Sequence, residues 1–464
     1  MPDYKQIIQL LPPEFEQKLQ EENRSVFLSS GIALIVLDDD PTGTQTIFDV
    51  PVLTTWGEPE ILQELKSNTP LFFILTNSRS LQKKEADNLA KEIGRNIRQA
   101  SEKSGRKVIV ISRGDSTLRG HYPNEVNALG KGLGIPDAPH ILIPAFFQGG
   151  RYTIDNIHYV KIGEELVPAG ETAFAKDASF GYQSSNLCDY VEEKTDGKIS
   201  AKEVVTISLE EIRLGGPKAI QHQLNTLKEG QVCIVNAAAQ SDLDVFASGF
   251  YHSDKSVRPV LLRTAASVIP GLAGVAVQPP FEKDDIKLEG RGGIIAVGSY
   301  VPMTTKQLEY LRKHFLVEYV EIDAEKLLDE NDFRMETERV SQRLNENLKK
   351  NQVVVVYTSR KIIKGNSPEE SLEIVNRISK GMVKVIQGIE VKPRFLLAKG
   401  GITSSDILTK ALEVKKAQVL GQIIPGVPLW RLDDSKRFSG LIYMPFPGNL
   451  GGDDSVFNAV QKLI

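Results

Sequence analysis

GIALIVLDDDPTGT, residues 31–44, sets an apolar run directly before three consecutive acids and a segment of Pro, Thr and Gly. The apolar run predicts a buried strand, and Pro, Thr and Gly are common turn formers. Two carboxylates about 4 Å apart repel by roughly 4 kcal/mol at the effective dielectric of a protein surface. A structural or functional role must therefore account for three adjacent acids. An acidic turn that simply ends the strand and an acidic functional site both fit this stretch.

Further apolar, β-branched runs follow in the first half of the chain: LFFILT (71–76), KVIVIS (107–112) and HILIPA (140–145). The segment SLQKKEADNLAKEIGRNIRQASEKSG separates the first two of them and places Leu81, Ala86, Leu89, Ile93 and Ile97 on one helical face. Strand, amphipathic helix and strand in this order predict a parallel sheet with crossover helices.

A second series of apolar runs begins near residue 290 and comprises GIIAVGS (293–299), VEYVEID (317–323), VVVVYTS (353–359), RFLLAKGG (394–401) and GLIYMPF (440–446). The segment QPPFEKDDIKLEGRGG before this series interrupts the apolar periodicity with prolines, mixed charges and glycines. The sequence therefore predicts two α/β domains with mainly parallel sheets, residues 1–280 and 290–464, and a substrate cleft between them.

The composition is typical of a soluble protein that handles small molecules. The 464 residues carry a net charge of −4 at pH 7, so no basic field would gather nucleic acid or an anionic membrane. The two cysteines, Cys188 and Cys233, fit neither a disulfide framework nor a thiolate zinc site. The N-terminus is polar, and no run of eighteen apolar residues occurs. We expect a cytoplasmic protein with no nucleic-acid or membrane partner.

Polar side chains follow each apolar run of the first half, at the edge where parallel sheets bind ligands. Arg binds a carboxylate bidentately while Asp and Ser bind hydroxyl groups, so this combination suits a sugar acid. A structural alternative is that Arg119 and Asp115 form only a local ion pair and that Ser116 or Thr117 caps a helix. The candidates at this edge are Asp38, Asp39, Asp40, Arg79, Arg113, Asp115, Ser116, Arg119 and Arg151.

Glycines follow the apolar runs of the second half, in AVGSYVPMT (296–304), AKGGITSSD (398–406) and PGNLGGDDS (447–455). Glycine lets a ligand approach the backbone, whose free amides bind phosphate oxygens. One such loop is more often an ordinary turn, but three in one domain favour a nucleotide or phosphate site. The chain has neither GxxxxGK(S/T) nor a well-placed GxGxxG, so a P-loop or a dinucleotide fold is not indicated.

These motifs resemble those of the four-carbon acid sugar kinases, a family of ATP-dependent enzymes that phosphorylate threonate, erythronate or 3-oxo-tetronate. DDPTGT (39–44) and GDSTLRG (114–120) resemble motifs of its N-terminal sugar-acid-binding domain, and GSY (298–300), KGGIT (399–403) and PGNLGG (447–452) resemble motifs of its C-terminal nucleotide-binding domain. The resemblance covers most of the chain and keeps the motif order.

The resemblance implies a kinase that uses ATP, with Mg²⁺ carried on the nucleotide and no metal site of its own. The expected partners are the sugar acid and ATP, and a homodimer is left open. It implies catalytic roles for Asp39 and Asp40. The substrate-binding residues would be Arg79, Arg113, Gly114, Asp115, Ser116 and Arg119, and the nucleotide-binding residues Ser299, Gly400, Gly401, Gly448, Asn449, Leu450 and Gly451.

Two other functions remain open from the sequence. Asp38, Asp40 and Thr42 after an apolar run also resemble the DxDxT motif of haloacid-dehalogenase-type phosphatases, in which the first Asp is the nucleophile. That motif is short, and it leaves the downstream motifs without a role. A non-catalytic sugar-acid sensor is the other alternative, and ATP turnover would separate it from the kinase.

Overall fold

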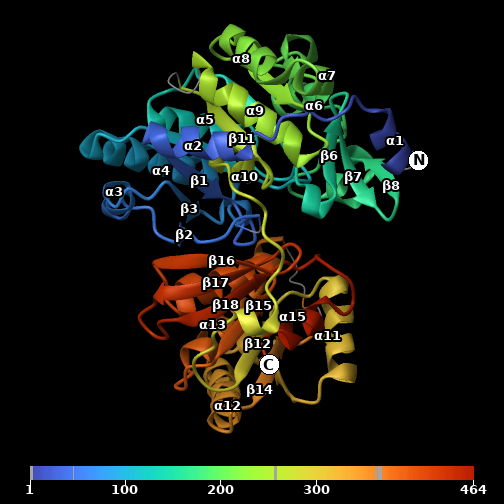
Figure 1. The fold of residues 1–464 in the computed structure, drawn as a ribbon. Helices are drawn as coiled ribbons and strands as arrows, with labels where there is room; N and C mark the ends of the chain where they lie inside the picture. Colours follow the sequence, from blue (N-terminus) through green and yellow to red (C-terminus); the bar gives the residue numbers. More distant parts are fainter. Residues whose placement is uncertain (1–3, 45, 255–258, 361–362, 364–367) are drawn as a thin grey trace. The chain divides into compact units, whose positions relative to one another are not determined.

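The protein is described here by a computed structural model covering residues 4–44, 46–254, 259–360, 363 and 368–464. It divides into two compact units (Figure 1). The first unit comprises Met1–Ile47 and Thr55–Val277, and the second comprises Phe48–Thr54 and Gln278–Ile464. Both units are α/β, which confirms the predicted fold class. None of the helices in the described ranges combines the length and apolar character that crossing a membrane requires.

A parallel sheet forms the centre of the first unit, with strand order β3-β1-β4-β11-β5-β10-β9. Every residue of β1 and β3 is buried, as the continuous apolar runs predict for a sheet covered on both faces. The strands are β1 (Ala33–Asp38), β3 (Leu71–Leu75), β4 (Val108–Arg113), β5 (His140–Ile143), β9 (Val205–Ile207), β10 (Val232–Val235) and β11 (Leu261–Thr264).

Helices connect these strands, and α4 shows why they form. Its N-terminus carries a capping box between Gln82 and Glu85, and its C-terminus is followed by Gly105 in the left-handed conformation. Ala86, Ile93 and Ile97 lie on the predicted face and are buried. The helices are α1 (Tyr4–Leu10), α2 (Gln20–Ser30), α3 (Glu58–Lys66), α4 (Lys83–Ser104), α5 (Asn124–Leu133), α6 (Leu187–Lys194), α7 (Leu209–Arg213), α8 (Gly216–Thr226), α9 (Gln240–His252) and α10 (Val268–Ala273).

The less regular stretch after residue 150 contains a small antiparallel sheet of β6 (Arg151–Ile154), β7 (Ile157–Ile162) and β8 (Glu165–Pro168). His158 on β7 is fully buried, and its Nε2 lies 2.7 Å from the Ser116 carbonyl oxygen. This sheet therefore supports the segment that follows β4.

The second unit has the strand order β13-β14-β12-β15-β18-β17-β16-β2. The first five strands are parallel, and the last three are antiparallel to their neighbours. Its strands are β2 (Val50–Leu53), β12 (Gly293–Val297), β13 (Glu318–Ile322), β14 (Val353–Thr358), β15 (Phe395–Lys399), β16 (Lys416–Ile424), β17 (Val427–Asp434) and β18 (Leu441–Phe446).

The helices of the second unit are α11 (Pro302–His314), α12 (Glu330–Lys349), α13 (Pro368–Gln387), α14 (Gly401–Asp406) and α15 (Ser455–Gln461). Ile295, Val355, Leu397, Met444 and Phe446 of the parallel strands form the centre of its core.

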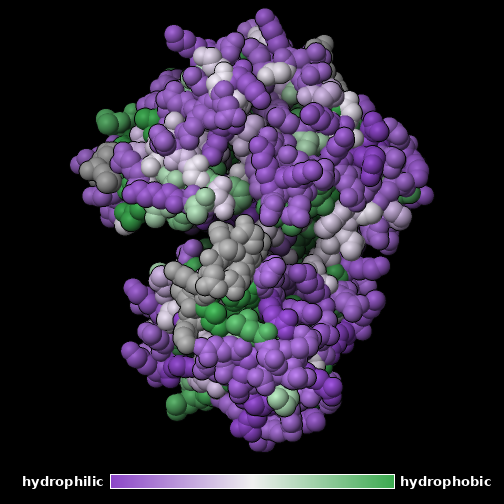
Figure 2. All heavy atoms as spheres, turned by 180° about the vertical axis from the view of Figure 1, so that it is seen from behind, coloured by the Kyte–Doolittle hydropathy of each residue, from purple (hydrophilic) through white to green (hydrophobic). Residues whose placement is uncertain are grey.

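Hydrophilic residues cover most of the face shown in Figure 2, with hydrophobic residues in smaller areas.

Candidate functional site

The first part of the site lies at the carboxyl ends of β1, β3 and β4. These neighbouring strands run in one direction, and their register pairs Asp38 of β1 with Leu75 of β3 and with Arg113 of β4. The acids that follow β1 therefore meet the basic residues that follow β3 and β4, although long helical segments separate them in the sequence.

Two guanidinium groups pair with all three consecutive acids. Arg113 Nη1 lies 3.0 Å from Asp38 Oδ1 and 3.7 Å from Asp39 Oδ1. Arg79 Nη2 lies 2.6 Å from Asp40 Oδ2 and 3.5 Å from Asp39 Oδ1. These pairs offset the repulsion that the sequence alone predicts for the crowded acids.

The cluster has a buried layer and an accessible layer. Only 2% of the Asp38 and Asp39 side chains and 5% of the Arg113 side chain are exposed. Asp40 and Arg79 are more accessible to solvent, with 20% and 18% of their side chains exposed. A ligand from solution can therefore touch Asp40 and Arg79, while Arg113 is held behind them by acids.

The pKa values of the three acids differ for the same reason. Burial raises the pKa of Asp38 to about 7, even though Arg113 opposes the shift. Burial likewise raises the pKa of Asp39 against the effect of Arg79 and Arg113. Burial also acts on Asp40, but Arg79 and hydrogen bonds from Thr42 outweigh it and leave the pKa of Asp40 below its usual value. Asp40 is therefore ionised at neutral pH.

The GDSTLRG segment contributes a second acid–guanidinium pair. Arg119 Nε donates to Asp115 Oδ2 over 2.7 Å, and Thr117 Oγ1 donates to the same oxygen. Arg79 Nη1 also lies 3.3 Å from Asp115 Oδ1, so Arg79 bridges this segment to the acids after β1. The local ion pair of the structural alternative exists, but it belongs to the larger cluster.

The other predicted residues of the first unit are Ser116 and Gly114 of this segment and Arg151 of β6. Ser116 is buried, and its carbonyl contacts His158 as described above. A Cβ atom on Gly114 would lie 2.2 Å from Arg263 Nη2, so only glycine fits there without displacing this side chain. Arg151 begins β6, and its Cζ lies 5.7 Å from the centroid of the Phe174 ring.

Sequence reasoning missed Arg263 at the end of β11. Its Nη1 donates to Ser112 Oγ over 2.8 Å and lies 3.4 Å from Glu125 Oε2. It borders a cavity of about 20 Å³, which is enough for one water molecule. The cavity is lined by Asp115, Leu118, Arg119, Tyr122, Leu142, Pro144, Tyr190, Arg263 and Thr264. The signal was present in the sequence, because Arg263 directly follows the apolar pair Leu261–Leu262 of β11.

The predicted glycine loops of the second unit also come together. β12, β15 and β18 are adjacent and parallel, and their register aligns Val297, Lys399 and Phe446 at the strand ends. A Cβ atom on Gly400 would lie 2.8 Å from Ser299 Cβ, and one on Gly448 would lie 3.2 Å from Ser299 Oγ. Gly401 begins α14, and the loop of Gly448, Asn449, Leu450 and Gly451 joins β18 to α15.

Two cationic residues at these strand ends were not among the predicted site residues. Arg360, just beyond β14, donates to the Ser299 carbonyl oxygen over 2.7 Å. Lys399 ends β15 and is fully buried, and its Nζ lies 3.3 Å from the Gly448 carbonyl oxygen. Lys399 was visible in the motif KGGIT, but its contact with a loop far along the chain was not.

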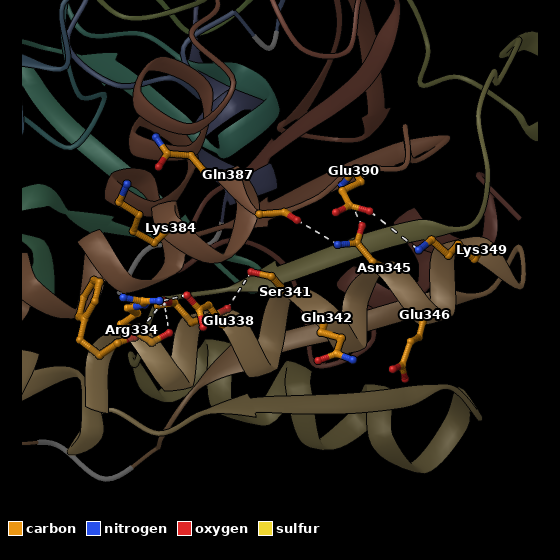
Figure 3. Close-up of a pocket in the computed structure, with 13 residues that line it drawn as sticks. Arg334, Glu338, Ser341, Gln342, Asn345, Glu346, Lys349, Lys384, Gln387 and Glu390 are labelled. Carbon is orange, nitrogen blue, oxygen red and sulfur yellow. Dashed lines mark hydrogen bonds and ion pairs between the residues drawn. The ribbon is translucent and has the colours of Figure 1, made fainter. Parts of the chain in front are cut away.

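A groove of about 800 Å³ lies elsewhere in the second unit, along α12 and the end of α13 (Figure 3). Several of its polar side chains form hydrogen bonds within the protein. Ser341 donates to the Val385 carbonyl and Asn345 to the Gly388 carbonyl. Lys349 pairs with Glu390. Because these groups join the two helices, the groove offers less to a ligand than the strand ends do.

No group of three or more His, Cys, Asp or Glu side chains in the described ranges is arranged to hold a metal ion. The acids after β1 already have guanidinium partners. The guanidinium groups at this edge can bind an anion, and the carboxylates beside them can accept hydrogen bonds from hydroxyl groups.

Two parts of the chain match described protein families. Residues 34–272 match a sugar-binding N-terminal domain, and residues 294–456 match a nucleotide-binding C-terminal domain. A D-erythronate kinase from Heliobacterium modesticaldum is 26% identical over an alignment of length 362, which covers 76% of this chain and 72% of that protein.

Two solved structures have the same fold. A protein of Salmonella typhimurium LT2 superposes with a TM-score of 0.67 at 16% identity, over 93% of this chain and 100% of that one. A Haemophilus influenzae protein of the DUF1537 family superposes with a TM-score of 0.63 at 18% identity, again over 93% and 100% of the two chains.

Proposed function

Because this chain belongs to the four-carbon acid sugar kinase family, we propose that it transfers the γ-phosphoryl group of ATP to a hydroxyl group of threonate, erythronate or 3-oxo-tetronate. The match to a nucleotide-binding domain and the D-erythronate kinase relative support a sugar-acid kinase in general. ATP as the donor and these three acids as candidate acceptors are part of the proposal.

The observation that carries the proposal is the accessible pair of Asp40 and Arg79 within the acid–guanidinium cluster. A sugar acid presents one carboxylate and several hydroxyl groups. Arg79 and Arg119 carry the charge that a carboxylate needs, and Asp40 is an acceptor for a hydroxyl proton. Asp115 pairs with both Arg79 and Arg119, and Arg113 pairs with Asp38 and Asp39.

Phosphoryl transfer requires mainly alignment and charge neutralisation. The acceptor hydroxyl oxygen forms a bond to the γ-phosphorus, the bond from that phosphorus to the β–γ bridging oxygen breaks, and the hydroxyl proton passes to Asp40. Asp39 forms an ion pair with Arg79, and Arg79 also pairs with Asp40. Mg²⁺ carried on the nucleotide would neutralise phosphate charge. Ser299, Gly400, Gly401 and the loop from Gly448 to Gly451 hold the nucleotide.

The phosphatase alternative loses support from the position of Asp38. Its Oδ1 faces Arg113, and its Oδ2 is buried, so a phosphate ester has no access to this carboxylate. In such a phosphatase the same carboxylate would be the nucleophile.

The proposed function is tested by measuring ADP release from Mg-ATP with each of a panel of four-carbon sugar acids. We expect ADP release that depends on one of these acids and is absent without it. Hydrolysis of a simple phosphate ester without ATP is the parallel assay. Ester hydrolysis together with no sugar-dependent use of ATP would overturn the kinase assignment in favour of a phosphatase.

A further inference from the structure

Side chains hold the loop of residues 447–452, between β18 and α15, through its carbonyl oxygens. Lys399 Nζ donates to the carbonyl oxygens of Pro447 and Gly448, over 2.5 and 3.3 Å. Thr304 Oγ1 of α11 donates to the same Gly448 oxygen over 3.0 Å. Gln307 Nε2 of α11 donates to the Leu450 and Gly452 oxygens, each over 2.9 Å. Side chains of two elements thus orient four peptide groups.

This orientation sets the direction of the amide groups. In a trans peptide the C=O and the following N–H point in opposite directions, and the cis peptide recorded in the described ranges lies elsewhere, at Tyr122–Pro123. The N–H groups of Gly448 and Asn449, which follow the two carbonyls bound by Lys399, therefore point away from Lys399. In the described part of the chain, none of the amides of residues 448–452 donates a hydrogen bond. Neighbouring free amides that face one way form a site for an anion.

Lys399 provides a second reason for an anion at this place. Its side chain is fully buried, and no ion pair joins it to a carboxylate among the described residues. Its Nζ lies 4.2 Å from the centroid of the Phe446 ring. Burial lowers the pKa of Lys399 to about 7, as expected for an ammonium group without a counter-charge. A phosphate bound to the other side of the loop would supply that counter-charge.

We propose that Lys399 is a positioning residue of the nucleotide site, which holds the Pro447 and Gly448 carbonyls so that the following amides face a phosphate group. The assignment rests on the proposed function, because it takes the anion to be a phosphate of ATP or ADP. Lys399 does not touch the nucleotide in this arrangement. It acts through the loop and through its charge.

The test compares ADP with adenosine, which lacks phosphates. Lys399→Met removes the charge and the donor but keeps a long apolar side chain. We expect it to weaken ADP binding at least tenfold, to leave adenosine binding within twofold of wild type, and to raise KM for Mg-ATP while KM for the sugar acid holds. Isothermal titration and steady-state rates give these values.

Two further variants keep the test independent of folding defects. Thr304→Val removes the other donor to the Gly448 carbonyl while Lys399 stays, so we expect a smaller loss of ADP affinity in the same direction. Lys410→Met is the matched control, because Lys410 is exposed and pairs with Asp406 rather than with the loop. It should bind ADP like wild type.

The outcomes separate this inference from the proposed function. Unchanged ADP affinity in Lys399→Met, or equal losses for ADP and adenosine, would overturn the positioning role even if the wild type is a sugar-acid kinase. A selective loss of ADP affinity without sugar-dependent ATP use in the wild type would uphold the inference and overturn the proposed function. A wild type that binds no ADP would overturn both.

Discussion

Replacing Asp40 with Asn tests the assignment of the proton acceptor. The substitution keeps the size of the side chain and an oxygen for the hydrogen bond from the Thr42 amide, which is 2.9 Å long. It removes the negative charge that faces Arg79. We expect kcat to fall by at least about 100-fold, the usual scale of a general-base contribution, which corresponds to about 2.7 kcal/mol in the activation barrier.

The expected cost in stability is smaller, because Arg79 retains two other acids. Removing one partner of a buried ion pair costs about 3–5 kcal/mol when the other charge is left alone. After the substitution, Arg79 still lies 3.5 Å from Asp39 and 3.3 Å from Asp115. Since both side chains of the lost pair are also partly exposed, we expect a loss of about 1–2 kcal/mol in the free energy of unfolding.

The pH dependence of this difference has a definite sign. The pKa of Asp40 is lower in the folded chain than its usual value of 3.8, so its charge stabilises the fold above pH 4. This contribution is lost as the pH falls through the folded-state pKa. The difference in stability between wild type and Asp40→Asn should therefore be constant near neutral pH and shrink below pH 4.

The measurements are steady-state kinetics of sugar-dependent ADP release and urea unfolding. Asp433→Asn is a suitable control, because Asp433 accepts two hydrogen bonds from Arg431, over 2.6 and 2.9 Å, at an exposed position of the second unit. It should leave kcat unchanged. KM for Mg-ATP should stay within twofold in both variants. A kcat within threefold of wild type for Asp40→Asn, or an equal loss of ATP affinity, would refute the reasoning.

Three further substitutions test the surroundings of both sites. Gly43→Ala would place a Cβ atom 1.9 Å from Asp38 Oδ2, so urea unfolding should show a free energy of unfolding lower by about 1–3 kcal/mol, and turnover should fall. Gly448→Val would crowd Ser299, and kinetics should show a raised KM for ATP with an unchanged KM for the sugar acid. Burial lowers the pKa of His158 to about 4, so unfolding should become easier by about 3 kcal/mol as the pH falls from 6.5 to 4, and His158→Gln should make this dependence shallower. An unchanged pH dependence would contradict the neutral, buried state of His158.

Local patterns in the sequence were enough to predict the strands and the residues at their ends. The apolar runs at residues 31–37, 71–76, 107–112 and 140–145 correspond to β1, β3, β4 and β5, because a continuous apolar run is stable where both faces of a sheet are covered. Parallel strands then place their carboxyl ends at one edge. Asp38 and Arg113 could therefore be assigned to the same neighbourhood before any contact was known.

The antiparallel part of the second unit was not predictable in the same way. β2 lies at residues 50–53, far from the other strands of its unit in the sequence, and pairs with β16. β16 and β17 contain glycine, proline and polar residues rather than a continuous apolar run. Their pairing depends on partners distant in the sequence, which periodicity does not report.

The sequence by itself determined which charged residues gather at the sheet edge, and only the tertiary structure decided which of them face solvent and which face one another. Asp38, Asp39 and Asp40 are three adjacent residues of the same type, yet the first two are buried against Arg113 while Asp40 stays accessible beside Arg79. Arg263 and Lys399 lie close to segments distant along the chain, at Gly114 and at the loop after β18. Burial and pairing shift the pKa and the reach of a charged group, and both depend on neighbours that only the folded chain supplies.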